Sequence, residues 1–297
     1  MILATALVVA GLLAPYALRR HSGHMSPRLV VAAHLSGLVL AWLGVVELIG
    51  AWALPEHGLL GLCRVALIEP HVLSSVPGTW LLLAVVLMLG GRALLAMSRT
   101  YLIVRRVHRS VTTYDRPASR GVTSADLGTV ACTVGFMRPQ IVVDQARLAA
   151  LSTAQQRAVL AHEHSHARGW HALIDLAARG LAAGIAPWPG ARVAYGEIRR
   201  HLEAAADDWA ARRTTHHDVA AAIVAAALSH PPAVVLGAAG WTAWRVDRLL
   251  SPPPRLLRHA LVALALVALA AAVVLQMSGH MVIGVHLLPA PFHCCGG

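Results

Sequence analysis

The sequence predicts a mainly α-helical, polytopic membrane protein with four transmembrane helices and one cytoplasmic α+β domain. Hydrophobic residues make up 57% of the 297-residue chain and charged residues only 13%, and the mean hydropathy is +0.61. Soluble domains carry about 25% charged residues. Four apolar stretches are long enough to cross a bilayer, and a more polar segment of about 160 residues separates the third from the fourth.

The expected spans lie at about residues 2–18, 29–54, 80–97 and 259–277. Residues 1–98 then hold three transmembrane helices, residues 99–258 form the domain between spans, and residues 278–297 form a short tail. We interpret the first span as a retained anchor and not as a cleaved signal peptide. No positive charge precedes it, and Arg19 and Arg20 follow it directly.

The orientation follows from the arginines, which account for all 25 basic residues and for the net charge of +11. They are concentrated between the first two spans and at both ends of the 99–258 segment, whereas the 55–79 connection has one arginine and two glutamates. The positive-inside rule therefore predicts a multi-pass protein of the cell membrane, with residues 99–258 in the cytoplasm and the N-terminus and the tail outside. Because the arginines flank apolar segments, we expect no direct nucleic-acid binding.

Two ionisable residues, Glu47 and Arg92, fall within expected spans. The predicted orientation brings Glu47 toward the outer leaflet and Arg92 toward the inner leaflet. We therefore expect each side chain to extend separately to its nearer membrane surface, and not to form a buried pair.

The domain between the spans has signals for short strands followed by helices. β-Prone runs lie at 129–136 and 140–143, and the second run could hold an extended substrate by β-addition. Ser152 and Gln155 form a capping box ahead of a helix over 154–168. A helix over 171–185 ends at the Pro187–Gly190 break, and another helix follows over 191–213.

The 154–168 helix carries the strongest chemical signal of the sequence, His162-Glu163-x-x-His166. Residues four apart project from the same helix face, so both imidazoles can bind one Zn²⁺ ion. Glu163 is placed to act as the general base that takes a proton from the attacking water. From the histidine and glutamate content, this pattern is expected by chance only roughly 0.02 times in a chain of this length.

A catalytic zinc site needs a third protein ligand. His171 is one residue off the metzincin spacing, so we interpret His171 and His164 as non-ligands. Only Glu197 and Glu203 lie further along the chain among the glutamates. Glu203 shares a helix face with Asp207, which could orient a ligand histidine, and we therefore favour Glu203.

The segment Arg200-His-Leu-Glu203-Ala-Ala-Ala-Asp207-Asp208 resembles the R-x-x-E-x-x-[AC]-D-D pattern of BlaR/MecR-type regulatory membrane zinc metallopeptidases. The 135–143 segment and the helix start at Leu151 and Ser152 look like the lead-in to HExxH in that family, and the expected topology also fits. The resemblance implies a gluzincin-like zinc metallopeptidase domain. His162, His166 and Glu203 would bind one Zn²⁺ ion, Glu163 would be catalytic, and Asp207 would support a ligand.

This chain departs from the family in two ways. The family often has an aspartate where His171 stands, and its antibiotic-sensing members have a large extracellular penicillin-binding domain after the last span. Only about 20 residues follow the last expected span here. We therefore expect no direct β-lactam sensing by such a domain.

The leading hypothesis is an integral-membrane zinc endopeptidase that cleaves a cytosolic or membrane-proximal protein. The resemblance points to a DNA-binding repressor as the substrate. An HtpX-type quality-control protease is the nearest rival and would have two spans before HExxH, whereas three are expected here. A non-catalytic transmembrane receptor or scaffold is a third hypothesis, but a structural metal site would not require Glu163. His201 and Tyr195 are candidates for stabilising the oxyanion.

Overall fold

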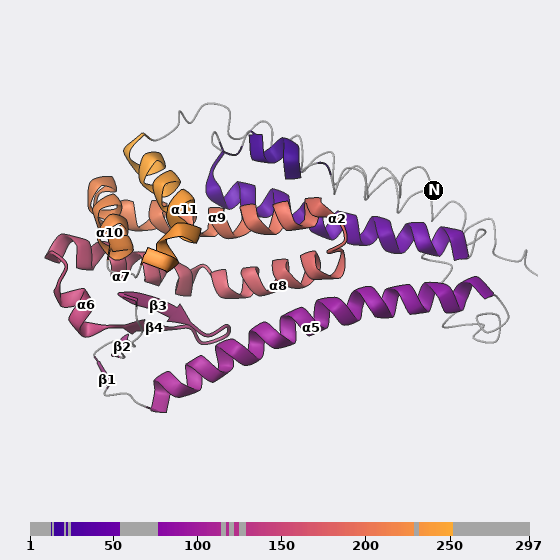
Figure 1. Ribbon diagram of the computed structural model, residues 1–297, viewed down its shortest axis with the longest axis horizontal. Helices are drawn as coiled ribbons and strands as arrows, with labels where there is room; N and C mark the ends of the chain where they lie inside the picture. The colour runs from indigo at the N-terminus through magenta and orange to yellow at the C-terminus, as the bar shows by residue number, and fades with distance from the viewer. Residues whose placement is uncertain are drawn as a thin grey trace, which may run out of the picture.

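The computed structural model consists of long helices that run side by side, with a small sheet and shorter helices at one end (Figure 1). It describes residues 13, 15–20, 22, 25–53, 77–113, 117–118, 122–124, 129–228 and 232–251.

Two helices have the length and apolar composition of membrane spans. Helix α2 covers Pro27–Ala53 and helix α5 covers Pro77–Thr113, with candidate membrane segments at Pro27–Ile49 and Leu83–Arg109. These helices correspond to the expected spans at 29–54 and 80–97. The expected span at 259–277 lies outside the described residues, as does most of the one at 2–18. The four-span topology therefore stays a prediction.

Helix α5 is longer than the span predicted at 80–97. Its 37 residues correspond to about 55 Å of helix, whereas the hydrocarbon core of a bilayer is about 30 Å thick. No glycine or proline interrupts residues 98–113, so nothing in the sequence ends the helix there. Its C-terminal half reaches the sheet, where Val104 packs against Val134 and Val142 and Tyr101 stacks on Phe136.

Helices α8 (His171–Gly184) and α9 (Pro189–Ala211) form a hairpin whose turn contains the predicted Pro187–Gly190 break. Both helices pack against α2, and α8 also packs against α5 (Figure 1). Trp42 of α2 donates from Nε1 to the carbonyl oxygen of Leu181, at 2.9 Å. The core that these helices share includes Val31, Leu38, Ala41, Ala178, Ala182, Ile185, Ala194, Ile198 and Leu202. Helices α8 and α9, which follow the boundary expected near residue 98, therefore pack closely against helices α2 and α5.

Arg92 does not extend alone toward the membrane surface as predicted. Its Nε donates to the carbonyl oxygen of Ala183 at 3.3 Å, in the last turn of α8. A cation is favourable at this position because the C-terminal carbonyls of a helix carry partial negative charge.

The described sheet has four short strands in the order β1-β2-β4-β3. Strands β3 (Ala131–Val134) and β4 (Gln140–Val143) form an antiparallel pair and confirm the two predicted runs. Strands β1 (Pro117–Ala118) and β2 (Val122–Ser124) were not predicted. Strand β4 lies between β2 and β3, so the prediction that its edge is free for a substrate is wrong. Among the described strands, β1 and β3 lie at the edges of the sheet.

The remaining helices surround the predicted motif. The short helix α6 (Gln145–Ala149) leads to α7 (Thr153–Arg168), whose capping box between Ser152 and Gln155 is present as predicted. Helices α10 (His216–Leu228) and α11 (Pro232–Leu250) were not predicted. A second core joins α7, α9, α10 and α11, and it includes Ala158, Ala210, Val219, Ala222 and Leu249.

Candidate metal centre

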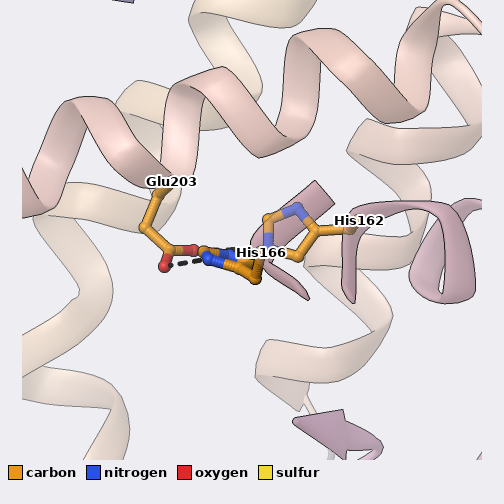
Figure 2. A group of neighbouring side chains, drawn as sticks. All are labelled: His162, His166 and Glu203. Atoms are coloured by element: carbon orange, nitrogen blue, oxygen red, sulfur yellow. Dashed lines mark hydrogen bonds and ion pairs between the residues drawn. The ribbon is translucent and has the colours of Figure 1, made fainter. Parts of the chain in front are cut away.

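His162 and His166 lie one turn apart on α7 and point in the same direction (Figure 2). Their Nε2 atoms are 3.0 Å apart. Glu203 approaches from α9, with Oε2 3.4 Å from His162 Nε2 and Oε1 3.5 Å from His166 Nε2. The structure thus brings together the three residues that the sequence singled out as candidate metal ligands. We call His162, His166 and Glu203 the ligand group.

The spacing of these atoms fits a zinc ion. Zn–N and Zn–O bonds of about 2.0–2.1 Å in a tetrahedron place neighbouring ligand atoms about 3.3 Å apart. The two Nε2 atoms are 3.0 Å apart, and each lies 3.4 or 3.5 Å from one oxygen of Glu203, a different oxygen for each histidine. These distances are close to that value. Two imidazoles and one carboxylate are also a donor set that zinc prefers.

Asp207 lies one turn after Glu203 on α9 and is fully buried. Its Oδ1 is 2.9 Å from His162 Nδ1, so it accepts the proton on that nitrogen and leaves Nε2 free to face the ligand group. This is the orienting contact that the ExxxD spacing predicted for Asp207.

Arg245 of α11 completes this carboxylate group and was missed at the sequence level. Its Nε and Nη2 donate to the two oxygens of Asp207 at 2.8 and 2.7 Å, and its Nη1 lies 3.1 Å from Glu203 Oε2. Arg248, one turn further along α11, pairs with Asp208 at 2.7 Å. At the sequence level, both arginines served only as topology signals. The charged residues Arg245, Asp247 and Arg248, set among apolar residues over 241–248, could have indicated a helix with a polar face.

The two ligand histidines have opposite pKa shifts. Burial alone would lower the pKa of His162, but the hydrogen bonds and charges of Asp207 and Glu203 outweigh it and raise the pKa to about 10. Burial lowers the pKa of His166 to about 4, so this imidazole is neutral at pH 7. The Glu203 carboxyl has a lowered pKa: burial would raise it, but the hydrogen bond from His162 and the charge of Arg245 dominate. The carboxylate is therefore ionised at neutral pH.

The carboxylate of Glu163 contacts the hydroxyl group of Thr133, in strand β3. Thr133 Oγ1 lies 2.8 Å from Glu163 Oε2 and 2.9 Å from the Glu163 carbonyl oxygen. Burial raises the pKa of Glu163, against the charge of His162 and the Thr133 hydrogen bond. A carboxylate with a raised pKa is suited to take up a proton and to return it near neutral pH. Thr133 was also missed, because a lone threonine in a predicted strand carries no chemical signal.

His171 lies outside the His162–His166–Glu203 group but contacts His166, and its role as a non-ligand stays a prediction. Its Nδ1 is 3.0 Å from His166 Nδ1. Trp170 has the left-handed φ of 55° that turns the chain sharply between α7 and α8, and Gly169 allows the ring to approach the end of α7. A Cβ at residue 169 would lie 2.6 Å from His171 Nε2. His171 therefore contacts His166 at Nδ1, the same ring nitrogen at which Asp207 contacts His162.

The other candidate residues point elsewhere. His164 is exposed and bonds back to the Leu160 carbonyl oxygen. His201 is buried, with its Nδ1 2.9 Å from the Glu197 carbonyl oxygen and its ring against Trp244. Tyr195 interacts with Asp175. His201 and Tyr195 are therefore poor candidates for stabilising an oxyanion at the ligand group.

A cavity of about 760 Å³ opens beside the site. His162, Glu163, Glu203 and Arg245 line its polar end, and the rest of the described lining consists mainly of alanine and β-branched side chains from α7, α10 and α11. The ligand group therefore lies at one end of a mostly apolar cavity.

Residues 98–188 match the family model of Peptidase family M48. The match supports the M48 metallopeptidase family. It includes α7 with His162, Glu163 and His166 and ends before Glu203, Asp207 and Arg245. M48 peptidases are zinc-dependent, and the His162–His166–Glu203 group fits a zinc ion. Comparison with curated proteins gave no match, and comparison with solved structures gave none.

Proposed function

We propose that this protein is an integral-membrane zinc endopeptidase. The observation that carries the proposal is the convergence of His162, His166 and Glu203 next to the carboxylate of Glu163 and at the end of a large cavity. Glu163 is the feature that separates a peptidase from a receptor with a structural metal, because a structural site is closed and needs no base.

The zinc ion would be held by His162, His166 and Glu203, and it would supply Lewis-acid activation of the scissile carbonyl and of the attacking water. Glu163 takes the proton from the water and returns it to the leaving amine. Thr133 can serve both protonation states of Glu163, because a hydroxyl group donates to a carboxylate and accepts from a carboxylic acid. Asp207 keeps the His162 proton on Nδ1, and Arg245 balances the charge of Asp207 and Glu203.

We infer that the substrate is a cytosolic or membrane-proximal protein segment bound in extended form. Among the described strands, β3 pairs with β4 on one side only, and the hydroxyl group of its Thr133 contacts Glu163. An extended segment can add to the edge of such a strand through main-chain hydrogen bonds. The apolar lining of the neighbouring cavity suits aliphatic side chains of the segment.

A DNA-binding repressor remains our proposed substrate, as the BlaR/MecR resemblance implies. Quality control of membrane proteins is the second candidate. It is kept because the comparison supports the M48 metallopeptidase family and not the BlaR/MecR subtype in particular.

The experiment compares cells that produce the wild-type chain with cells that produce Glu163→Gln. We expect Glu163→Gln to retain zinc and to abolish the cleavage products, measured by quantitative sequencing of new protein N-termini. Loss of an intact repressor in wild-type cells, with induction of its target genes, supports signalling. Accumulation of damaged membrane proteins in Glu163→Gln cells supports quality control. Identical N-termini in both strains would overturn the peptidase proposal.

A further inference from the structure

A second cavity, of about 430 Å³, lies on the other side of His166 from the ligand group. We call it the arginine cavity. It is bounded by the start of α2, the end of α7, the start of α8 and the middle of α9, and its polar lining consists of Arg28, Ser165, Arg168 and His171. No carboxylate is found among the described residues that line it.

The two arginines carry positive charge that other residues do not balance. Arg28 and Arg168 are exposed, and neither forms an ion pair with any residue in the described part of the chain. Ser165 is 3% exposed, and its hydroxyl makes no hydrogen bond within that same part. A cavity with two guanidinium groups and a free hydroxyl is suited to an anion with several acceptor oxygens.

The protonation states of the histidines add a third donor. If His166 binds zinc through Nε2, its proton lies on Nδ1 and is donated to His171 Nδ1, 3.0 Å away. A neutral His171 that accepts at Nδ1 carries its own proton on Nε2. His171 is 6% exposed, and its Nε2 has no hydrogen-bond partner among the residues that the structure describes. This N–H can therefore donate to a group bound in the arginine cavity, whose lining includes His171.

We propose that the arginine cavity binds a phosphate group through Arg28, Arg168 and the Nε2–H of His171, and that the bound phosphate strengthens zinc binding by His166. An anion at His171 Nε2 makes Nδ1 a better acceptor and His166 a stronger ligand, as other outer partners of metal-binding histidines do. The zinc coupling rests on the proposed function, whereas phosphate binding does not.

The position of the cavity indicates where the phosphate could come from. Arg28 is the second residue of α2, so it lies at the end of a candidate membrane span, where lipid headgroups are found. The cavity can thus receive the phosphate of an anionic lipid or of a soluble phosphate ester, and both present the same chemistry to the arginines.

The test uses the zinc-loaded full chain in maltoside micelles, which contain no phosphate. Glycerol 3-phosphate and short-chain phosphatidylglycerol are titrated separately by calorimetry, with the matching diacylglycerol as the phosphate-free control. We expect saturable binding that Arg168→Gln weakens about tenfold, the effect of one charged hydrogen bond. Arg157→Gln is the matched control, because Arg157 is an exposed arginine of the same helix outside the cavity. Thermal unfolding checks that both variants are folded.

The coupling is measured as the rate at which a chelator removes zinc. We expect phosphate to slow zinc loss about tenfold in the wild type and to have no effect in His171→Phe, whereas Arg168→Gln should need about tenfold more phosphate for the same effect. Response to glycerol 3-phosphate indicates a soluble ligand, and response to the lipid alone indicates a headgroup. Binding that survives Arg168→Gln but disappears with the zinc would overturn the proposal. A chain that binds phosphate through Arg168 but never retains zinc would instead contradict the proposed function.

Discussion

At the residue scale, the site depends on pairs in which one side chain orients another. Asp207 orients His162, His171 contacts His166, and Thr133 holds Glu163. Only the pair of Asp207 and His162 could be expected from sequence motifs, because His162 belongs to HExxH and Asp207 follows Glu203 by one helical turn.

Thr133 is expected to position the general base. Thr133→Val removes the hydrogen bond to Glu163, so we expect kcat to fall by roughly 10²-fold with little change in KM. The acidic limb of the pH–rate profile should move to higher pH, because the hydroxyl lowers the pKa of Glu163. The assay is cleavage of an unfolded protein such as casein by the chain in detergent. Thr133→Ser should restore both properties, and an unchanged pH profile in Thr133→Val would contradict this role.

Arg245 is expected to matter more for stability than Arg248. Arg245→Met removes the arginine that donates to both oxygens of the fully buried Asp207 carboxylate, which costs about 3–5 kcal/mol. Arg248→Met affects the partly exposed Asp208 and should cost about 1 kcal/mol or less. Thermal unfolding of the two variants in the same detergent gives the comparison. Equal shifts in the unfolding midpoint would show that burial of the carboxylate does not set the cost.

Zinc binding is expected to strengthen as pH rises. In the zinc-free protein the pKa of His162 is raised to about 10, so the charged form stabilises the fold fully below pH 6.5, and this contribution is lost as pH rises toward 10. Zinc must displace that proton, so the apparent affinity should rise about tenfold per pH unit between about pH 7 and 9. Calorimetry in buffers of different ionisation enthalpy counts the proton released. Asp207→Asn should reduce the slope of zinc affinity against pH. A zinc affinity that does not change with pH in the wild type would show that zinc does not displace a proton from His162.

At the element scale, the α8–α9 hairpin connects α2, a candidate membrane span, to the ligand group. One face of α9 contributes Ala194, Ile198 and Leu202 to the core shared with α2, and another face presents Glu203 and Asp207 to α7 and α11. Small residues allow this close packing, so a change in α2 can reach Glu203 through a single helix.

Gly184 tests this packing at the end of α8. A Cβ at residue 184 would collide with the ring of Trp42, whose Nε1 bonds to the Leu181 carbonyl oxygen. Gly184→Ala should therefore destabilise the protein by about 1–3 kcal/mol. Gly196→Ala in α9 is the control, since nothing lies within 4 Å of its added Cβ, and it should be neutral or stabilising by up to about 1 kcal/mol. Thermal unfolding measures both, and a stabilising Gly184→Ala would contradict the contact.

At the scale of the whole molecule, α5 supports a membrane location. Its exposed large apolar side chains include Trp80, Leu83, Leu87, Met88, Leu94, Leu102 and Ile103. Soluble proteins rarely expose an apolar surface of this extent. The start of α2, which carries Arg28, and the C-terminal end of α5, which carries Arg105 and Arg106, lie at the end of the bundle where α7 and the sheet are found (Figure 1).

This arrangement predicts the topology. Because arginines concentrate on the cytoplasmic side, reporter fusions after Arg106 or Arg213 should read as cytoplasmic, and fusions after Pro70 or Leu288 should read as external. The measurement uses paired reporters that are active on opposite sides of the membrane. An external reading at Arg213 would overturn the model of a cytoplasmic peptidase.

The sequence by itself determined the local features: the α7 helix with its capping box, the β3 and β4 strands, the helix break at Pro187–Gly190 and the HExxH motif. Each of these depends on residues within a few positions of one another. The third ligand could be inferred because Glu203 and Asp207 lie one turn apart on one helix.

Only the tertiary structure decided which distant residues meet. Thr133 and Arg245 lie 30 and 82 positions from Glu163, and no local pattern marks either one. The spacing of His171 predicts a non-ligand and gives no sign of any contact with the site, yet the left-handed turn at Trp170 brings its ring against His166. The packing of α8 and α9 along α2 was also hidden, because apolar periodicity shows that a helix face is buried but not what covers it.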